Sequence, residues 1–402
     1  MRILQVGATF VGAQKKIEYA IHQHMLRQSH DSSILYAIGE SDDRNIVCYE
    51  NRLDSLVRRA LRKVLGKNPR FALISTLKLI RRIKEYRPDL IHIHIIHHGY
   101  LDYGLLLKHI AKQKIPVIFT AHDMWFFTGG CYYYSEIGCD RFKTGCVDCP
   151  KSSSELDCRR GATEKYLKKK LSLFKKLSDV SFVSVSPWVH SEIKKSSLAS
   201  YPLYTVMNAV DNVNYTPLAK TKREKFTVIG VAANWDGRKG LNRFYELGLA
   251  LKDLCDIILV GNVEESLKDG APSNITFYGY AKSTDELYDL YASCDLHVSM
   301  SFEETFGLTF VEAALCGIRS IGFNSTAIPA VIEKTHGYVI SPCSVGGVTE
   351  KIRQLIQNRE SCEITEEEGL EIKEYFSPKR MALEYQRVYE EIFASHSKNQ
   401  GE

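Results

Sequence analysis

Two glutamates, Glu304 and Glu312, are the side chains of this 402-residue chain whose type and spacing most clearly suggest chemistry. They lie in the segment SFEETFGLTFVEAALCG at 301–317, where Gly307 separates an apolar, strand-like run from an apolar helical pattern. The first N–H groups of a helix lack partners within it, and with the helix dipole they favour an anion such as phosphate. Glu304 would reach other polar groups of that ligand, and Glu312 could accept hydrogen bonds from the vicinal hydroxyls of a ribose. A capping Glu304 and a solvated Glu312 are the alternative.

A pair of cations follows the first strand predicted in the second half of the chain. The segment AANWDGRKGL at 232–241 places Arg238 and Lys239 in a loop between a strand and a helix. Both suit a diphosphate, since arginine offers a fork of N–H donors and lysine a point charge. Two solvated cations on a surface turn are the alternative.

A histidine and an aspartate, His122 and Asp123, end a buried strand in the segment VIFTAHDMWFFTG at 117–129. A histidine at a strand end of an α/β fold can bind a sugar hydroxyl or move a proton. A satisfied structural histidine is the alternative. Four further histidines are interpreted as packing or cleft-lining residues rather than metal ligands: His92, His94, His97 and His98.

The elements that must position these residues form two series of strands separated by helical patterns. The first series is predicted at 2–6, 33–37, 90–94, 117–120 and 182–185, and the second at 226–232, 257–260, 275–278, 296–300, 320–323 and 338–340. Such alternation predicts parallel sheets with helices on both faces. We expect two Rossmann-like, doubly wound α/β domains, 1–210 and 211–377, that face each other across a cleft and are joined by the polar stretch at 208–225.

Composition excludes several classes of protein. Apolar residues make up 44% and charged residues 25%, which excludes a largely disordered, collagen-like or disulfide-stapled chain. No apolar run approaches the roughly 18–20 residues of a membrane span, and the first residues lack a signal-peptide pattern, so we expect a cytoplasmic protein. The net charge of +5 hides a basic part, +14 over 1–210, and an acidic part, −9 over 211–402, which suggests different partners.

Four of the eleven cysteines cluster in a loop-like, aromatic-rich insertion at 130–150: Cys131, Cys139, Cys146 and Cys149. Cys146 and Cys149 have the Cys-x2-Cys spacing of zinc ligands, and four thiolates suit a closed structural site. A structural zinc ion and four reduced thiols both stay open. A zinc ribbon that binds nucleic acid is disfavoured because acids outnumber bases in the cluster, so we expect no nucleic-acid partner.

The segment 52–87 is the most basic of the chain, with twelve Lys and Arg residues against Asp54 and Glu85. Its first part, RLDSLVRRALRKVL, has an amphipathic helical pattern. Such a helix can lie on an anionic membrane surface. We favour this interpretation over a core-packed helix with a solvated cationic face.

Together these motifs resemble the retaining glycosyltransferases of the GT-B type, in the large family marked by a Glu-x7-Glu motif, glycosyltransferase family 4. The resemblance covers most of the chain, and Glu304 with Glu312 is its most specific part. It also rests on the loop at 7–13, His122-Asp123, Ser186-Pro187, Asn208-Ala209-Val210-Asp211 and Arg238-Lys239-Gly240. The resemblance implies that Glu304 and the backbone of Phe306, Gly307 and Leu308 contact the transferred sugar, and that Glu312 holds the nucleotide ribose.

For the other motif residues, the resemblance implies contacts with the diphosphate and the acceptor. Arg238 and Lys239 would neutralise the leaving diphosphate, and His122 would contact the sugar at the reaction centre. Gly12 and its loop would lie near the diphosphate and the acceptor. The sequence departs from the family at Asn234, where an arginine is frequent, and Arg238 would take over its role.

The function implied by the resemblance is transfer of a sugar from a UDP- or GDP-linked donor to a lipid-linked or oligosaccharide acceptor in surface polysaccharide or lipopolysaccharide biosynthesis. The first domain would bind the acceptor and the second the donor, with a last helix in 378–397 crossing back. The enzyme would be peripheral on the inner face of the cell membrane and retaining. No Asp-x-Asp occurs in the chain, so we expect no metal cofactor for catalysis. A nucleotide-sugar epimerase on the same fold and a non-catalytic nucleotide-binding protein are the alternatives.

Overall fold

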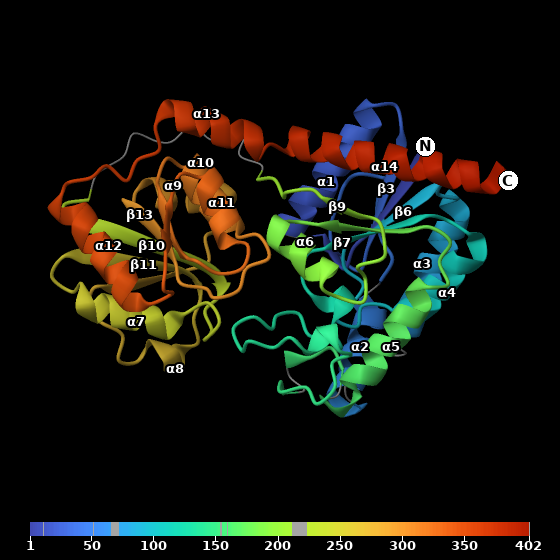
Figure 1. The fold of residues 1–402 in the computed structure, drawn as a ribbon, viewed down its shortest axis with the longest axis horizontal. Helices are drawn as coiled ribbons and strands as arrows, with labels where there is room; N and C mark the ends of the chain where they lie inside the picture. The colour runs from blue at the N-terminus through green and yellow to red at the C-terminus, as the bar shows by residue number, and fades with distance from the viewer. Residues whose placement is uncertain are drawn as a thin grey trace. The chain divides into compact units, whose positions relative to one another are not determined.

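The chain forms two compact units, which are coloured along the sequence in Figure 1. The computed structural model describes residues 1–10, 12–50, 52–65, 72–152, 155–158, 160–210 and 223–401. Most of the predicted linker, with Asp211, lies outside these residues. Unit 1 combines Met1–Asn208 with Pro378–Glu402, and unit 2 is Ala209–Ser377. None of the helices in the described ranges has both the length and the apolar character that crossing a bilayer requires.

Unit 1 is built on a seven-stranded parallel sheet in the order β5-β3-β1-β6-β7-β8-β9. The three strands β6, β7 and β8 are fully buried, as in parallel sheets that helices cover on both faces. The strands of this sheet are β1 (Arg2–Val6), β3 (Asp31–Tyr36), β5 (Ile46–Cys48), β6 (Leu90–Ile93), β7 (Val117–Ala121), β8 (Val180–Ser184) and β9 (Leu203–Thr205). Two short strands, β2 (Thr9–Phe10) and β4 (Ile38–Gly39), form a separate two-stranded sheet.

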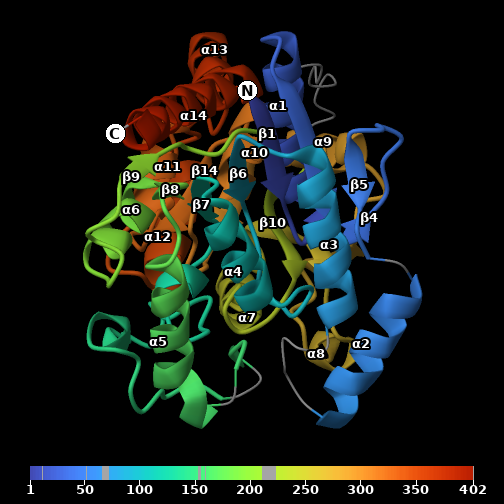
Figure 2. The same cartoon turned by 90° about the vertical axis from the view of Figure 1, so that its right-hand side faces the viewer.

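The helices of unit 1 are α1 (Gly12–Arg27), α2 (Arg52–Leu65), α3 (Leu73–Tyr86), α4 (Tyr103–Gln113), α5 (Thr163–Phe174), α6 (Pro187–Lys194) and α14 (Pro378–Gly401). Helices α3, α4 and α5 pack in a row (Figure 2). The Ser186-Pro187 motif begins α6, since the Ser186 hydroxyl accepts from the Val189 N–H at 3.2 Å. Helix α14 packs along α1, where His24 Nε2 lies 2.7 Å from Gln386 Oε1.

Unit 2 contains a six-stranded parallel sheet in the order β12-β11-β10-β13-β14-β15. Its strands are β10 (Phe226–Asn234), β11 (Cys255–Asn262), β12 (Ile275–Gly279), β13 (Leu296–Ser299), β14 (Ser320–Phe323) and β15 (Tyr338–Ile340). Its helices are α7 (Leu241–Ala250), α8 (Glu265–Lys268), α9 (Thr284–Ala292), α10 (Leu308–Leu315), α11 (Ile328–Lys334), α12 (Val345–Gln357) and α13 (Glu366–Tyr375).

Helices cover both faces of the unit 2 sheet because neighbouring residues of its strands point to opposite sides. Val228 of β10 joins a core with Phe244 of α7 and Ile352 of α12. The next residue, Ile229, joins a second core with Tyr291 of α9. Two parallel-sheet α/β units of this kind confirm the predicted fold class.

Candidate active site

The best-defined site of unit 2 lies where the strand order of its sheet reverses, between β10 and β13. In a doubly wound sheet, the loops that leave two such strands diverge and make room for a ligand at the carboxyl ends. The loops 235–240 and 300–307 both start there. They also touch, because a Cβ on Gly240 would lie 3.0 Å from the Met300 carbonyl oxygen. Glycine therefore permits the close approach of the two loops.

Lys239 and Glu304, one from each loop, form an ion pair. Their side chains are 23% and 17% exposed, so the pair is partly buried. The backbone fixes both residues: the Lys239 N–H donates to Asp236 Oδ1 at 2.8 Å, and the Glu304 N–H donates to Thr326 Oγ1 at 3.0 Å. Two residues 65 positions apart thus lie side by side. A ligand that carries a diphosphate and sugar hydroxyls could replace each partner of this pair with its own groups.

Gly307 forms the entrance to α10 in a conformation that few other residues adopt. Its φ is +94°, and a Cβ there would lie 2.7 Å from the Phe310 ring. No side chain caps α10, so the N–H groups of Leu308 and the following residue remain suited to an anion. Phe306 is 2% exposed, with its ring 6.0 Å from the ring of Phe376. Only the backbone of Phe306 can therefore serve a ligand.

Two arginines shape the cation loop at 235–240, and only Arg238 was predicted from the sequence. Arg238 is 29% exposed, with Nη2 3.9 Å from Asp236 Oδ2. Arg243 of α7 donates to the carbonyls of Gly237 at 3.1 Å and Arg238 at 3.2 Å. Its guanidinium lies 4.6 Å from the Phe302 ring, so it fastens the two loops together. The sequence signal that could have identified Arg243 is its place in the first turn of a predicted helix, because the helix dipole disfavours a cation there unless another contact stabilises it.

Glu312 lies within α10, beside Tyr291 of α9. Burial, and then the Glu312 carboxylate, raise the pKa of the Tyr291 hydroxyl well above its ordinary value. The ribose role of Glu312 stays a prediction. Asn234, at the end of β10, accepts a hydrogen bond from the Tyr280 hydroxyl at 3.3 Å and lies 3.4 Å from Asn262 Nδ2. The sequence identified Asn234 only as a departure from the family, and it did not predict these contacts with Tyr280 and Asn262.

In unit 1 the predicted His122 directly follows β7. Its Nε2 lies 3.1 Å from His94 Nδ1, and the two rings are stacked. Burial lowers the pKa of His122 to about 4 and that of His94 well below its ordinary value. Both rings are therefore neutral at pH 7 and act as donors and acceptors, not as cations.

Hydrogen bonds assign the proton of each ring. Gln5 Nε2 donates to the Glu18 carbonyl at 3.1 Å, so Gln5 Oε1 is the atom that accepts from His94 Nε2 at 3.1 Å. His94 Nδ1 then has no proton and accepts from the Nε2–H of His122. In this tautomer His122 Nδ1 carries no proton, so it can accept a hydrogen bond but not donate one.

The remaining predicted residues of unit 1 have different surroundings. His92 packs inside, 2.6 Å from the Tyr389 hydroxyl and 2.7 Å from Thr120 Oγ1, in agreement with a packing role. His97 Nε2 lies 2.9 Å from Asp123 Oδ2, and with His98 these form the one group of possible metal ligands in the described residues whose donor atoms already lie within 4.8 Å of one another. The His97 ring also stacks on that of Trp125, with the ring centroids 5.0 Å apart.

Gly12 begins α1 with φ +58° and is exposed. The four cysteines line one pocket of unit 1.

His122 belongs to unit 1, whereas Lys239 and Glu304 belong to unit 2. That these three serve one ligand stays a prediction.

Comparison with known proteins gave matches along most of the chain. The family model described as Glycosyltransferase Family 4 matches residues 19–212, and that described as Glycosyl transferases group 1 matches residues 218–371. A putative colanic acid biosynthesis glycosyl transferase of Escherichia coli K12, WcaC, is 22% identical over 89% of this chain and 90% of its own.

Two solved structures share the fold. Sucrose-phosphate synthase from Thermosynechococcus elongatus aligns with a TM-score of 0.71 at 14% identity, covering 98% of this chain and 100% of that one. Anabaena HepE in complex with UDP and glucose aligns with a TM-score of 0.64 at 15% identity, covering 97% and 100%. The fold is therefore that of the two-domain GT-B enzymes.

Proposed function

Because the chain is an enzyme that belongs to the glycosyltransferases of group 1 and family 4, we propose that it transfers a sugar from a UDP- or GDP-linked donor to a saccharide acceptor. The observation that supports the donor most is in unit 2, where the Lys239–Glu304 pair lies next to the uncapped start of α10. The UDP and glucose bound to HepE, which has the same fold, support a donor of this class.

Cleavage of the sugar–diphosphate bond builds negative charge on the leaving group and positive character on the sugar ring. Lys239, Arg238 and the first N–H groups of α10 would stabilise the leaving diphosphate, as preorganised charges and dipoles do. Glu304, released from Lys239, would accept hydrogen bonds from sugar hydroxyls, and Glu312 from the ribose. Because these cations belong to the chain, we propose transfer without a divalent cofactor. Retention of configuration is proposed from the family.

We propose that unit 1 binds the acceptor. His122 has an unprotonated Nδ1 that could accept a hydrogen bond from a hydroxyl at the reaction centre. Gly12 at the start of α1 is exposed, and a Cβ there would meet nothing within 4 Å, so a ligand could approach its backbone. The name of WcaC, which matches this chain along nearly its whole length, supports a role in surface polysaccharide biosynthesis.

The apolar side of α2 supports an anionic membrane surface as a further partner. Its side chains are 53–79% exposed: Leu53, Leu56, Val57 and Val64. Arg58 is instead buried and donates to Glu50 at 2.8 Å. The alternative of a core-packed apolar face is wrong for these residues. The start of α3 adds exposed Leu73, Ile74 and Leu77, and an ion pair between Lys78 and Asp54 joins the two helices.

An exposed apolar face within a basic segment suits the interface of an anionic bilayer. Arg81 and Arg82 of α3 are 81% and 55% exposed, and these two cations share one acid, Glu85, at 2.8 and 3.4 Å. We therefore propose that unit 1 docks peripherally on the cytoplasmic face of the membrane. From there it would reach a lipid-linked acceptor.

The experiment that tests the proposal combines the full chain with UDP- and GDP-sugars and oligosaccharide acceptors. We expect one nucleotide-sugar class to bind in calorimetry, and Lys239→Ala to weaken that binding about tenfold. Glu304→Gln should lower transfer about 100-fold, which is the size of effect seen for a lost transition-state contact. Its Tm should change little, because a partly exposed ion pair contributes about 1 kcal/mol or less. The matched control is Glu333→Gln, an exposed glutamate of α11, which should transfer normally.

Three outcomes would contradict the proposal. Conversion of the donor without any acceptor would indicate the epimerase. Nucleotide binding without turnover would indicate a binding protein. Near-full transfer by Glu304→Gln would remove the role given to that carboxylate.

A further inference from the structure

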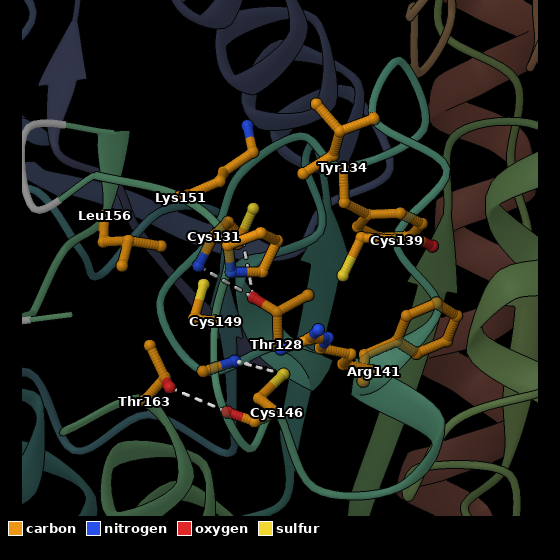
Figure 3. A pocket seen from close by; sticks show the side chains of 14 residues that line it. Thr128, Cys131, Tyr134, Cys139, Arg141, Cys146, Cys149, Lys151, Leu156 and Thr163 are labelled. Atoms are coloured by element: carbon orange, nitrogen blue, oxygen red, sulfur yellow. Dashed lines mark hydrogen bonds between the residues drawn. The ribbon is translucent and has the colours of Figure 1, made fainter. Parts of the chain in front are cut away.

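We propose that Cys131, Cys139, Cys146 and Cys149 bind one structural zinc ion in unit 1. All four line a single pocket with a cavity of about 20 Å³, and Figure 3 shows them arranged around it. A space of this size accepts one atom or water molecule. No histidine or carboxylate is among the lining residues, so the available donors are the four sulfur atoms. Four thiolates are the donor set of closed tetrahedral zinc sites.

The turn from Cys146 to Cys149 is held in an unusual backbone conformation. Cys146 and Asp148 have φ of 59° and 49°, in the left-handed region that disfavours residues other than glycine. Each costs on the order of 1 kcal/mol or more and persists only where its surroundings impose it. A metal ion that joins both ends of this turn would be such a constraint.

Hydrogen bonds already position Cys146, one of them at its sulfur atom and one at its carbonyl oxygen. The Gly129 N–H donates to Cys146 Sγ at 3.1 Å, and the Thr163 hydroxyl donates to the Cys146 carbonyl at 2.7 Å. Hydrogen bonds of this kind orient the ligands of metal sites. Cys146 is therefore the anchor of the proposed site.

The insertion has little regular structure that could hold it without a cross-link. Residues 130–150 contain one short helical turn, Arg141–Lys143, and a single bridge between Cys131 and Leu156. Their buried aromatic contacts are made by Phe142 and Tyr134 with Phe127. Segments with so small a core gain stability from a bound metal.

The sulfur atoms must move inward to bind the ion. No three of these four described sulfur atoms lie within 4.8 Å of one another, whereas zinc holds sulfur at about 2.3 Å. The Cys131 thiol donates to the Tyr133 carbonyl at 2.6 Å. Binding would break this bond, release four thiol protons to solvent and select inward side-chain rotamers. Arg141 and Lys151 line the same pocket and would offset the net charge of −2 on the zinc tetrathiolate.

The full chain, expressed with zinc in the medium, tests the proposal by elemental analysis and thiol titration. We expect about one zinc ion per chain and four thiols that react only after zinc is removed. Replacement by cobalt(II) should give the visible absorption of a tetrahedral thiolate complex. Cys149→Ser should reduce zinc content at least tenfold. Two matched controls should retain zinc: Cys158→Ser, a buried neighbour whose sulfur donates to the Gly129 carbonyl at 3.0 Å, and Cys48→Ser in β5.

Several results would overturn the proposal. The first is a wild-type chain that is folded without zinc and has its four cysteines as free thiols or in disulfides. Unchanged zinc in Cys149→Ser, or zinc lost from Cys158→Ser alone, is another. Metal content and the cobalt spectrum of the wild-type chain need neither a folded variant nor glycosyl transfer, so they decide the matter independently of the proposed function.

Discussion

At the scale of single residues, two glycines at the ends of α10 have similar backbones and different surroundings. Gly307 has φ +94°, and a Cβ there would meet the Phe310 ring at 2.7 Å. Gly317 has φ +87°, and a Cβ there would meet nothing within 4 Å. An alanine at either position is strained by its backbone, but only at Gly307 does it also clash.

We therefore predict that Gly307→Ala destabilises the chain by about 2–3 kcal/mol and Gly317→Ala by about 1 kcal/mol, as the strain and overpacking costs suggest. Gly307→Ala should also weaken nucleotide-sugar binding, because the start of α10 must shift. Urea unfolding and calorimetry measure both effects. Equal losses of stability in the two variants would show that the clash is relieved.

His122 depends on a hydrogen-bonded chain through His94 to Gln5 that keeps its proton on Nε2. We predict that ¹⁵N chemical shifts show a neutral His122 with a protonated Nε2 at pH 7. Gln5→Leu should mix the two tautomers and lower transfer about tenfold, since Nδ1 would be an acceptor only part of the time. Gln113→Leu, at the exposed end of α4, is the control. If His122 kept a single, unchanged tautomer in Gln5→Leu, the hydrogen bonds through His94 to Gln5 would not be what fixes that tautomer.

At the scale of elements, the unusual feature of α2 is the side that it exposes. Its charged Arg58 pairs inside with Glu50, while Leu53 and Val64 are 71% and 79% exposed. A leucine that leaves water for a bilayer gains on the order of 1–2 kcal/mol. The helix is thus oriented to contribute binding energy outside its own unit.

We predict that the chain sediments with vesicles that contain anionic lipid, and less so as salt rises. Leu53→Glu combined with Val64→Glu should lower the bound fraction at least tenfold. The matched control places the same charges at Leu249 and Leu370, which are similarly exposed in unit 2. Vesicle binding equal in both double variants would contradict the proposed surface. If sedimentation showed a dimer of the wild-type chain and the Leu53→Glu, Val64→Glu variant were a monomer, the partner of this face would be a second copy of the chain instead.

At the scale of the whole molecule, buried neutral histidines link stability to pH. Burial lowers the pKa of His122 to about 4 and of His297 to about 3, and it lowers those of His92 and His94 well below their ordinary value. Each favours the folded state fully above pH 6.5, and this contribution is lost as pH falls toward the folded pKa. Carboxyl groups with lowered pKa, such as Glu368, lose theirs only below an ordinary value of 4.5.

Between pH 6.5 and 5, the free energy of unfolding should therefore fall by about 1.4 kcal/mol per pH unit for each such histidine. Three of the four lie in unit 1, so unit 1 should become unstable first. Two compact units need not unfold in one transition. Pulse proteolysis in urea, followed by peptide mapping, measures the unfolding of each unit separately. A stability that stays level across this range would refute the prediction.

The sequence was most informative where a segment is buried on both faces. The runs predicted at 90–94 and 117–120 are the strands Leu90–Ile93 and Val117–Ala121, because a central parallel strand is apolar throughout. It missed Ile46–Cys48 and Leu203–Thr205, which are short edge strands with weak, partly exposed patterns. The last helix, predicted within 378–397, continues to Gly401.

The sequence by itself determined which residues follow the strands: Lys239, Glu304 and His122 were assigned to segments after strand ends because apolar runs and glycines mark these boundaries. Only the tertiary structure decided what each contacts. The bond between Gln5 and His94 spans 89 positions and the pair of Lys239 and Glu304 spans 65. Periodicity likewise predicted an amphipathic α2 but not which face it exposes. Local patterns record burial and backbone geometry, whereas partners are set by which strands become neighbours when the chain folds.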